Sequence, residues 1–329
     1  MPGTHNTTTT ATGDPLARFA EDVAQSLQQT PRRIAPMYLY DALGSALFEA
    51  ICQLPWYRIT RAEHALLARH AAGILAAAGG VPQIVELGPG SGEKLAHLTT
   101  AAREGAVIDV HLVDISDAAL DLARRTLQRT GARITLHHGT YEEGLRQALA
   151  ARRASAPVLV AFLGSNIGNF DPPEAASLLA AIRAALAPGD SLLLGVDLVK
   201  PERTLQLAYD DPIGVTASFN LNVLRRMNEE LGADFDLARY RHRAVWNAQE
   251  SRVEMHLVST RRQDVEIPAA GLRFTMEEGE SIWTESSYKF TPERVDALGR
   301  TAGFTPGRPW VDAEAGFALT LFTVDATRP

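Results

Sequence analysis

Apolar residues in the first 80 positions recur at the three- and four-residue spacing of amphipathic helices. Such a helix is predicted from Pro15 to about Gln29, with apolar residues at Leu16, Phe19, Val23 and Leu27. A second helix is predicted from about Tyr40 to Gln53. A third is predicted to begin at a capping box formed by Thr60 and Glu63 and to end near Gly79. Residues 1–13 are threonine-rich without a basic and then apolar run, so we expect a disordered tail rather than a signal peptide.

Apolar runs then alternate with amphipathic stretches. The predicted strands are Gln83–Leu87, Ala106–Val113, Arg133–His138, Pro157–Leu163 and Ser191–Val196. Ser116 caps an intervening helix that ends at Gly131, and Asp171 with Pro172 begins another that ends at Pro188-Gly189. Strands that alternate with helices predict parallel βαβ units covered on both faces.

The alternation changes after Asp197. A helical stretch, Val215–Leu231, is followed by the extended segments Arg252–Thr260 and Ile282–Phe290. A helix near Pro292–Ala302 and two strands, Arg308–Val311 and Phe317–Val324, then resemble the end of a class I methyltransferase sheet. We therefore predict an α/β fold with two domains. Residues 62–198 and 288–329 would form a Rossmann-like, cofactor-binding domain, and residues 14–61 and 199–287, the N-terminal helices plus an insertion, a substrate-binding domain.

The first predicted strand leads into a glycine-rich turn, Val-Glu-Leu-Gly-Pro-Gly-Ser-Gly-Glu-Lys at 85–94. Glycine lets the backbone turn tightly and approach a ligand, because it has no Cβ. The turn alone fits NAD, FAD or S-adenosylmethionine. Its spacing, Gly88-x-Gly90-x-Gly92, differs from the G-x-G-x-x-G that suits a pyrophosphate.

Two carboxylates narrow the choice of cofactor. Glu86 lies inside the end of the first strand, where its charge suits a cationic sulfonium. Asp114 ends the second strand, where a carboxylate can accept both ribose hydroxyls, although NAD enzymes share this feature. The turn Leu-Ala-Pro-Gly-Asp at 186–190 is common before the fifth strand of class I methyltransferases. The combination favours a methyltransferase that uses S-adenosylmethionine.

The loop after the fourth strand faces the transferred methyl group in this type of sheet. Asp171-Pro172-Pro173 resembles the motif that clamps a planar nitrogen in some methyltransferases, but Glu174 replaces the aromatic residue. We therefore interpret Asp171 as a helix cap. Asn169 is the better site candidate, since its amide can both donate to a carboxylate and accept from an amine. An asparagine that merely caps a turn remains the alternative.

Composition limits the possible partners. The net charge of −7 argues against nucleic acid as the main partner, since nucleic-acid-binding proteins usually carry a basic face. The single cysteine, Cys52, excludes an intrachain disulfide and favours a cytoplasmic location, and we interpret it as a core residue. No apolar stretch approaches the roughly 20 residues that span a bilayer. The nine histidines lack metal-ligand spacing, and no large spare apolar face is evident, so we expect no metal, no membrane contact and a monomer.

Several long segments are similar to one known family. They are 38–45 (Tyr-Leu-Tyr-Asp-Ala-Leu-Gly-Ser), 54–57 (Leu-Pro-Trp-Tyr), 60–63, 162–169, 208–211, 214–217, 233–236 and 284–287 (Thr-Glu-Ser-Ser). From about Glu21 to the C-terminus, the chain resembles the histidine Nα-methyltransferases of ergothioneine biosynthesis. The resemblance implies that free L-histidine is trimethylated on its α-amine to hercynine, with S-adenosylmethionine as the methyl donor.

The resemblance also implies roles for individual residues. The cofactor contacts would be Gly88, Lys94 and Asp114, with Thr140 and Tyr141 beside the adenine. The family often has Asp-Phe at these last two positions, so Thr140 would accept from the adenine amine more weakly.

The substrate contacts implied by the resemblance fall into two groups. The backbone end of histidine would be held by Tyr57, Asn169 and Tyr209, while Tyr40 would line the amine pocket. Of these, Tyr40 and Asn169 would be the catalytic residues. Arg58-Ile59 replaces a commoner Tyr-Pro after Tyr57, which could alter the local turn.

Glu285 and Ser287 would hold the imidazole. On an extended segment, two residues that are two positions apart point to the same face. A carboxylate can take one imidazole N–H, and a hydroxyl can serve the other nitrogen in either role. Phenylalanine would leave both groups unpaired, which can discriminate by about 10⁴-fold.

The expected chemistry needs no dedicated base. A like charge lowers the pKa of an amine, so a sulfonium beside the α-amine favours its neutral form, and water can take the proton. We expect the protein mainly to position and desolvate the amine. Three alternatives stay open: an Nα-methyltransferase of another amino acid, such as a tryptophan derivative; a non-catalytic S-adenosylmethionine-binding module; and, with less support, a macromolecular methyltransferase.

Overall fold

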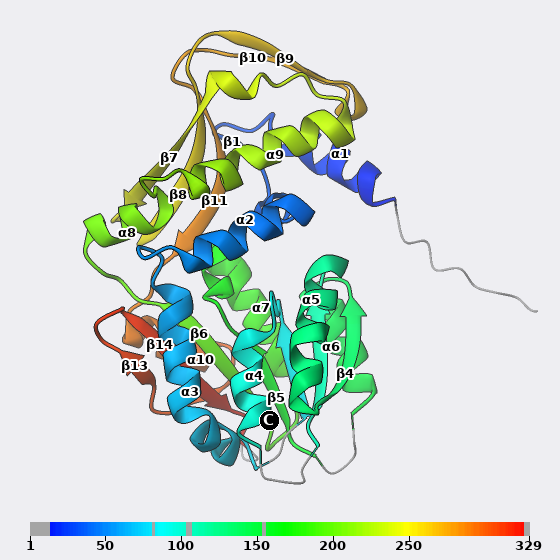
Figure 1. Ribbon diagram of the computed structural model, residues 1–329, viewed down its shortest axis with the longest axis vertical. Coiled ribbons are helices and arrows are strands. Elements are labelled where there is room, and N and C mark those ends of the chain that lie inside the picture. Colours follow the sequence, from blue (N-terminus) through cyan, green and yellow to red (C-terminus); the bar gives the residue numbers. More distant parts are fainter. Residues whose placement is uncertain (1–13, 81–82, 103–106, 153–155, 326–329) are drawn as a thin grey trace, which may run out of the picture.

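The computed structural model describes residues 14–80, 83–102, 107–152 and 156–325. Its larger sheet has the strand order β12-β14-β6-β5-β2-β3-β4, with β13 also paired to β14 (Figure 1). The strands are β2 Gln83–Leu87, β3 Asp109–Asp114, β4 Arg133–His138, β5 Val158–Phe162, β6 Ser191–Asp197, β12 Thr305–Pro306, β13 Trp310–Asp312 and β14 Phe317–Thr323. Strands β2 to β6 pair in parallel, and β14 is antiparallel to β6. The predicted Rossmann-like sheet is confirmed.

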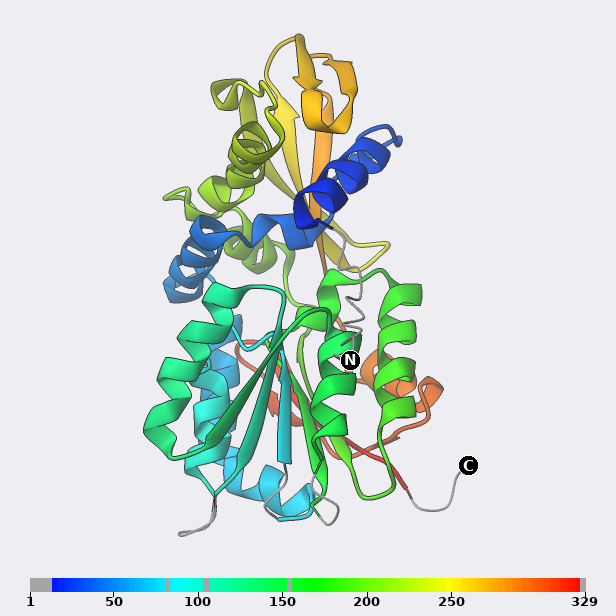
Figure 2. The ribbon, with the colours of Figure 1, turned by 90° about the vertical axis from the view of Figure 1, so that its right-hand side faces the viewer.

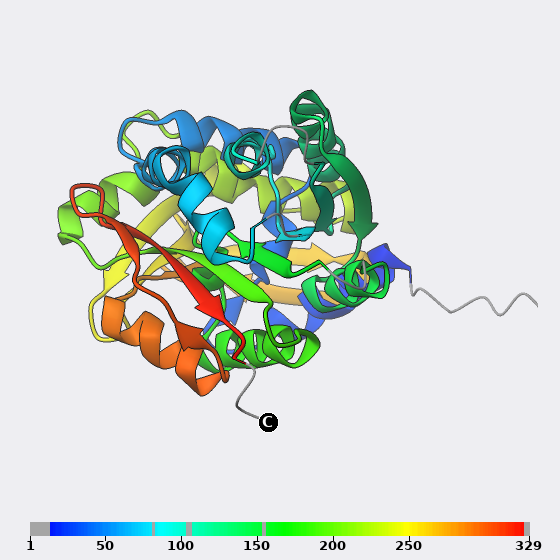
Figure 3. The same ribbon diagram turned by 90° about the horizontal axis from the view of Figure 1, so that it is seen from below.

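Helices cover both faces of this sheet, as Figure 3 shows from below. They are α3 Ile59–Ala77, α4 Glu93–Thr100 and α5 Asp117–Leu127 on one face, and α6 Tyr141–Ala150, α7 Pro172–Ala185 and α10 Pro292–Thr301 on the other. Alternate residues of one strand serve different cores, because Ile84 belongs to the cluster with α3 and α4 while Val85 belongs to the cluster with α6 and α7. Two-sided burial explains why the central strands are continuous apolar runs.

The predicted helix caps had different outcomes. Ser116 accepts from Ala119 N at the start of α5, and Asp171 begins α7, so both predictions are confirmed. The capping box of Thr60 and Glu63 is wrong, because α3 already begins at Ile59 and the Glu63 side chain is fully buried. A carboxylate buried in the first turns of a helix serves tertiary contacts instead of the helix end.

A second, smaller sheet lies beyond the carboxyl ends of the large sheet's parallel strands (Figure 2). Its order is β1-β11-β8-β7, with strands β1 Arg32–Arg33, β7 Tyr240–Asn247, β8 Arg252–Ser259 and β11 Ser281–Tyr288. A separate hairpin pairs β9 Gln263–Ile267 with β10 Leu272–Met276. The helices around this sheet are α1 Pro15–Ser26, α2 Ala42–Gln53, α8 Glu202–Tyr209 and α9 Val215–Leu231.

The N-terminal segment and the insertion share this smaller part of the molecule. Helix α2 packs on α9, and β1 pairs in parallel with β11. Short 3₁₀ helices complete the connections: η1 Pro36–Leu39, η2 Gln128–Thr130, η3 Asn166–Asn169, η4 Leu237–Arg239 and η5 Pro268–Ala270. The exact domain boundaries stay a prediction. The expected tail, residues 1–13, and the expected strand start at Ala106 lie outside the described residues.

Candidate active site

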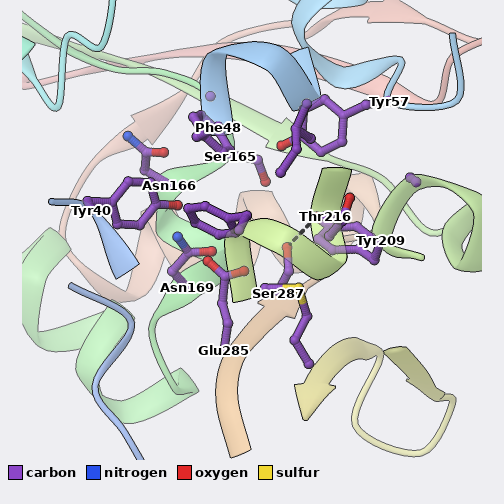
Figure 4. A pocket seen from close by; sticks show the side chains of 15 residues that line it. Tyr40, Phe48, Tyr57, Ser165, Asn166, Asn169, Tyr209, Thr216, Glu285 and Ser287 are labelled. Atoms are coloured by element: carbon purple, nitrogen blue, oxygen red, sulfur yellow. Dashed lines mark hydrogen bonds between the residues drawn. The ribbon is translucent and has the colours of Figure 1, made fainter. Parts of the chain in front are cut away.

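One pocket lies where the two sheets meet (Figure 4), with an empty volume of about 470 Å³ that includes its opening. All six residues expected to contact the substrate line it: Tyr40, Tyr57, Asn169, Tyr209, Glu285 and Ser287. The remaining lining residues are Phe48, Ile51, Gly164, Ser165, Asn166, Ala208, Thr216, Phe219 and Met255. The fold thus brings together side chains from segments more than 200 positions apart. Their individual roles stay predictions.

Strand β11 presents Glu285 and Ser287 to the pocket. A register shift between Trp283 and Glu285 interrupts the pairing with β8, and Glu285 lies opposite Met255. Glu285 is only 7% exposed. Burial raises the pKa of its carboxyl group to about 7, against the lowering effects of the Lys289 ammonium and a hydrogen bond with Tyr40.

Lys289 lies behind the pocket wall, in contact with the lining residues Tyr209 and Ser287, and the sequence analysis missed it. Its ammonium group is fully buried and donates to the Tyr209 hydroxyl and to Ser287 Oγ, both at 2.7 Å. It also pairs with Asp197 Oδ2 at 3.0 Å. The alternation that placed Glu285 and Ser287 on one face extends to position 289, so the same spacing could have found this lysine.

Aromatic rings form much of the pocket wall. Tyr40 makes edge contacts with Phe48 and Phe219, and Tyr57 makes one with Tyr209. Burial raises the pKa of the Tyr40 and Tyr57 hydroxyls well above the ordinary value. These phenols are therefore neutral hydrogen-bonding groups in an apolar, largely aromatic wall.

The glycine-rich turn lies at the end of β2, next to the pocket. Gly88 has a φ of +72°, and a Cβ there would lie 2.8 Å from Asn166 Nδ2 and 3.1 Å from the Tyr141 hydroxyl. Asn166, which also lines the pocket, therefore links the two sites, and the sequence analysis missed it. A side chain at position 88 would collide with Asn166 and Tyr141, so this turn requires glycine.

Two buried carboxyl groups adjoin the glycine turn. Asp114 ends β3, accepts from Ser116 N at 2.9 Å, and has a pKa raised by burial to about 6. Burial raises the pKa of Glu86 to about 8, and its Oε2 has no hydrogen-bond partner among the described residues. Unpaired buried oxygen atoms call for a polar or cationic ligand. Beside the glycine turn, these groups fit the ribose hydroxyls and other polar atoms of S-adenosylmethionine.

Lys94, which is partly exposed, and the fully buried Glu63 form an ion pair between the two sites. Lys94 Nζ lies 3.0 Å from Glu63 Oε2, and both Glu63 oxygens accept from Gly164 N at 2.9 Å. Glu63 therefore connects α3 to the loop after β5. The sequence analysis assigned Glu63 to a capping box and so did not predict this contact. The predicted contact of Lys94 with the cofactor stays a prediction.

Thr140 begins α6 and forms a capping box with Glu143. Its hydroxyl donates to Glu143 Oε2 at 3.0 Å and accepts from Glu143 N at 3.3 Å. One acceptor lone pair is left for an adenine amine. Tyr141 packs edge-on against Phe162, at the end of β5. The adenine contacts of Thr140 and Tyr141 stay predictions.

The other expectations concern metals, membranes and Cys52. In the described ranges, no group of three or more His, Cys, Asp or Glu residues could hold a metal ion. No helix in the same ranges combines the length and apolar character needed to cross a bilayer. Cys52 is buried in the core, as predicted.

The strand order, with an antiparallel β14 beside β6, and the glycine turn after β2 define a class I methyltransferase that uses S-adenosylmethionine. The model of one family, described as histidine-specific methyltransferase, SAM-dependent, matches residues 19–324. The chain belongs to this family.

Similar proteins include enzymes with different amino acid substrates. The chain is 41% identical over 303 residues to the histidine N-alpha-methyltransferase of Mycobacterium tuberculosis, covering 91% of this chain and 93% of that protein. It is 29% identical to Ergothioneine biosynthesis protein 1 of Neurospora crassa, covering 80% of this chain and 32% of that protein. It is 25% identical to an L-tryptophan methyltransferase of Psilocybe serbica, covering 85% of each chain.

Proposed function

We propose that this protein trimethylates the α-amino group of L-histidine to hercynine, as a step in ergothioneine biosynthesis. The observation that carries the proposal is the joint placement of Glu285 and Ser287 on one strand, in a pocket that Asn169 also lines (Figure 4). A carboxylate and a hydroxyl match the two ring nitrogens, while the amide and the tyrosines match an amino acid backbone.

Gly88, Lys94, Asp114, Thr140 and Tyr141 would hold S-adenosylmethionine. When bound, the cofactor supplies a methyl group on an electrophilic sulfonium. The glycine turn would let the backbone approach it closely, and Asp114 would offer oxygen atoms to its ribose. Lys94, at the start of α4, places a cation at the same edge of the sheet.

The protein would orient the neutral α-amine of the substrate and exclude water from it. Asn169, Tyr57 and Tyr209 would bind the amino acid backbone, and Tyr40 would line the amine site. The raised pKa values of Tyr40 and Tyr57 make them hydrogen-bonding groups rather than bases. Water would take the amine's proton, and positioning would supply most of the rate acceleration.

A tryptophan-like substrate is the second candidate, favoured by the similarity to the Psilocybe enzyme. An indole has one N–H donor and no acceptor nitrogen, so it can pair with Glu285 but leaves Ser287 unmatched. The structure of the pocket therefore favours histidine.

Mass spectrometry of the purified protein tests both candidates. The protein is incubated with S-adenosylmethionine and each of the twenty amino acids separately. A gain of three methyl groups on histidine alone is the expected result. Methylation of tryptophan instead would establish the second candidate. Cofactor binding without any methylation would favour a binding module. We further propose that the enzyme acts in the cytoplasm as a monomer, without nucleic acid or membrane partners.

A further inference from the structure

Lys289, Tyr209 and Ser287 form a hydrogen-bond network beneath the pocket. One hydroxyl hydrogen of this network has no acceptor within the network. Lys289 has three N–H groups, which are directed at the Tyr209 hydroxyl, Ser287 Oγ and Asp197 Oδ2. The two hydroxyl oxygens also lie 2.7 Å from each other. Each hydroxyl has one hydrogen, and a single contact between them uses only one of the two. The hydrogen of the other hydroxyl is therefore available to an acceptor in the pocket.

The side-chain amino group of Lys289 is held in its charged form. Burial alone would lower its pKa, but the Tyr209 hydroxyl and the Asp197 carboxylate raise the pKa above the ordinary value. Asp197 also accepts from Lys200 Nζ at 2.6 Å, so this carboxylate is surrounded by cations. A charged ammonium can only donate, and each of its two hydroxyl neighbours must therefore use a lone pair to accept from it.

The acidity of the two hydroxyls sets the direction of their mutual hydrogen bond. A phenol is a stronger acid than an alkyl alcohol, so Tyr209 is the better donor and Ser287 the better acceptor. Ser287 Oγ then accepts from both Lys289 and Tyr209, which fills its two lone pairs. Its own hydrogen is the one that faces the pocket.

We propose that Lys289 is a positioning residue that fixes Ser287 as a hydrogen-bond donor, so that the site selects a neutral imidazole. The ring's N–H faces Glu285, and its unprotonated nitrogen faces Ser287. An imidazolium is rejected, because its second N–H meets an oxygen with no free lone pair. This inference rests on the proposed function, since it specifies which protonation state of the histidine ring the same pocket binds.

Nuclear magnetic resonance of the wild-type protein tests the bound ring directly. The sample contains ¹⁵N-labelled histidine and S-adenosylhomocysteine, which prevents turnover. We expect one protonated and one unprotonated ring nitrogen, whose chemical shifts are well separated. Two protonated nitrogens would overturn the inference. If the enzyme methylates histidine but binds it as imidazolium, the proposed function stands and only this inference fails.

A selectivity measurement tests the part played by Lys289. Pyrrol-2-ylalanine and pyrrol-3-ylalanine each keep one ring N–H and replace the other nitrogen by C–H. With wild-type protein, we expect kcat/KM for histidine to exceed that of the better analogue by at least about tenfold, because the Ser287 hydrogen is left unpaired. In Lys289→Met, the two hydroxyls can reorient and satisfy each other, so this ratio should fall by about tenfold.

Lys200→Met is the matched control. It removes a second cation from Asp197, but Lys200 does not contact either hydroxyl. The selectivity ratio should remain at the wild-type value. Circular dichroism and binding of S-adenosylhomocysteine check that both variants fold. A loss of activity in Lys289→Met with an unchanged ratio would overturn the positioning role, and if this variant does not fold, the resonance experiment on wild-type protein decides.

Discussion

The glycine turn and the substrate pocket adjoin each other, yet they are built in different ways. The turn is a contiguous segment, residues 88–92, whose glycines have φ values between +54° and +77°. The pocket gathers side chains from positions 40 to 287, carried by helices, loops and two strands of the smaller sheet. Under the proposed function, the backbone of the turn would receive the cofactor, whereas the side chains of the pocket would contact the substrate. A change in substrate would therefore alter the pocket and leave the turn intact.

The largest expected effect comes from Glu63, which contributes to both regions. In Glu63→Gln, Lys94 loses its buried partner and Gly164 N loses a charged acceptor. Breaking one partner of a buried ion pair costs about 3–5 kcal/mol. We expect this loss in the free energy of unfolding, measured with urea, together with weaker binding of both S-adenosylmethionine and histidine.

Asp190→Asn is the control for Glu63. Asp190 is also buried and pairs with Arg152 at 2.7 Å, but it precedes β6, away from the pocket. It should lower stability similarly while both ligands bind normally to the folded protein. Normal binding of S-adenosylmethionine and histidine by Glu63→Gln would show that Glu63 does not support both the cofactor region and the substrate pocket.

Gly88→Val should damage the cofactor region most. The new side chain would meet Asn166 and Tyr141 in a left-handed backbone conformation, at a combined cost of about 3 kcal/mol. We expect the Kd of S-adenosylmethionine, measured by calorimetry, to rise by at least about 100-fold. Gly131→Ala is the control: its φ of +75° is similar, but no atom lies within 4 Å of the added Cβ. Equal effects of the two variants would show that backbone strain, not occupied space, is responsible.

Glu285→Gln should damage the substrate pocket alone. The amide keeps the size of the side chain but loses the charge-assisted hydrogen bond, which is worth about 1.5–3 kcal/mol. The KM for histidine should rise about 10- to 100-fold, while the Kd of S-adenosylmethionine stays within twofold of wild type. An unchanged KM would exclude Glu285 from imidazole recognition.

Acidification should have the smallest effect. The Glu285 carboxyl has a pKa of about 7, raised by burial, so its charged form is lost as the pH falls through neutrality. Between about pH 8 and pH 6, the KM for histidine at saturating cofactor should rise by about tenfold. The imidazole of free histidine titrates over the same pH range and also changes the KM. In the Glu285→Gln variant, only this titration of the substrate contributes to the pH dependence of the KM, so the variant is the reference. Identical pH profiles for the two proteins would contradict the assignment.

Sequence patterns predicted the large sheet better than the small one. Strands β2 and β6 were found within one residue of their ends, because burial on both faces makes them unbroken apolar runs. Strand β7 of the smaller sheet was missed and has mostly half-exposed residues, and β9 of the separate hairpin was missed although its burial alternates. One-sided burial gives a weaker signal than burial on both faces.

The sequence by itself determined the glycine turn, the fold class and six of the residues that line the pocket. These follow from local patterns, since a strand, a turn and a matching motif lie within a few positions of one another. Only the tertiary structure revealed the partners of Glu63 and Lys289. Each of these buried charges is stabilised by groups brought close by the fold: Lys94 and Gly164 in one case, Asp197 and Tyr209 in the other. The cost of burying a charge is offset only where partners converge in space, and separation along the chain does not encode that convergence.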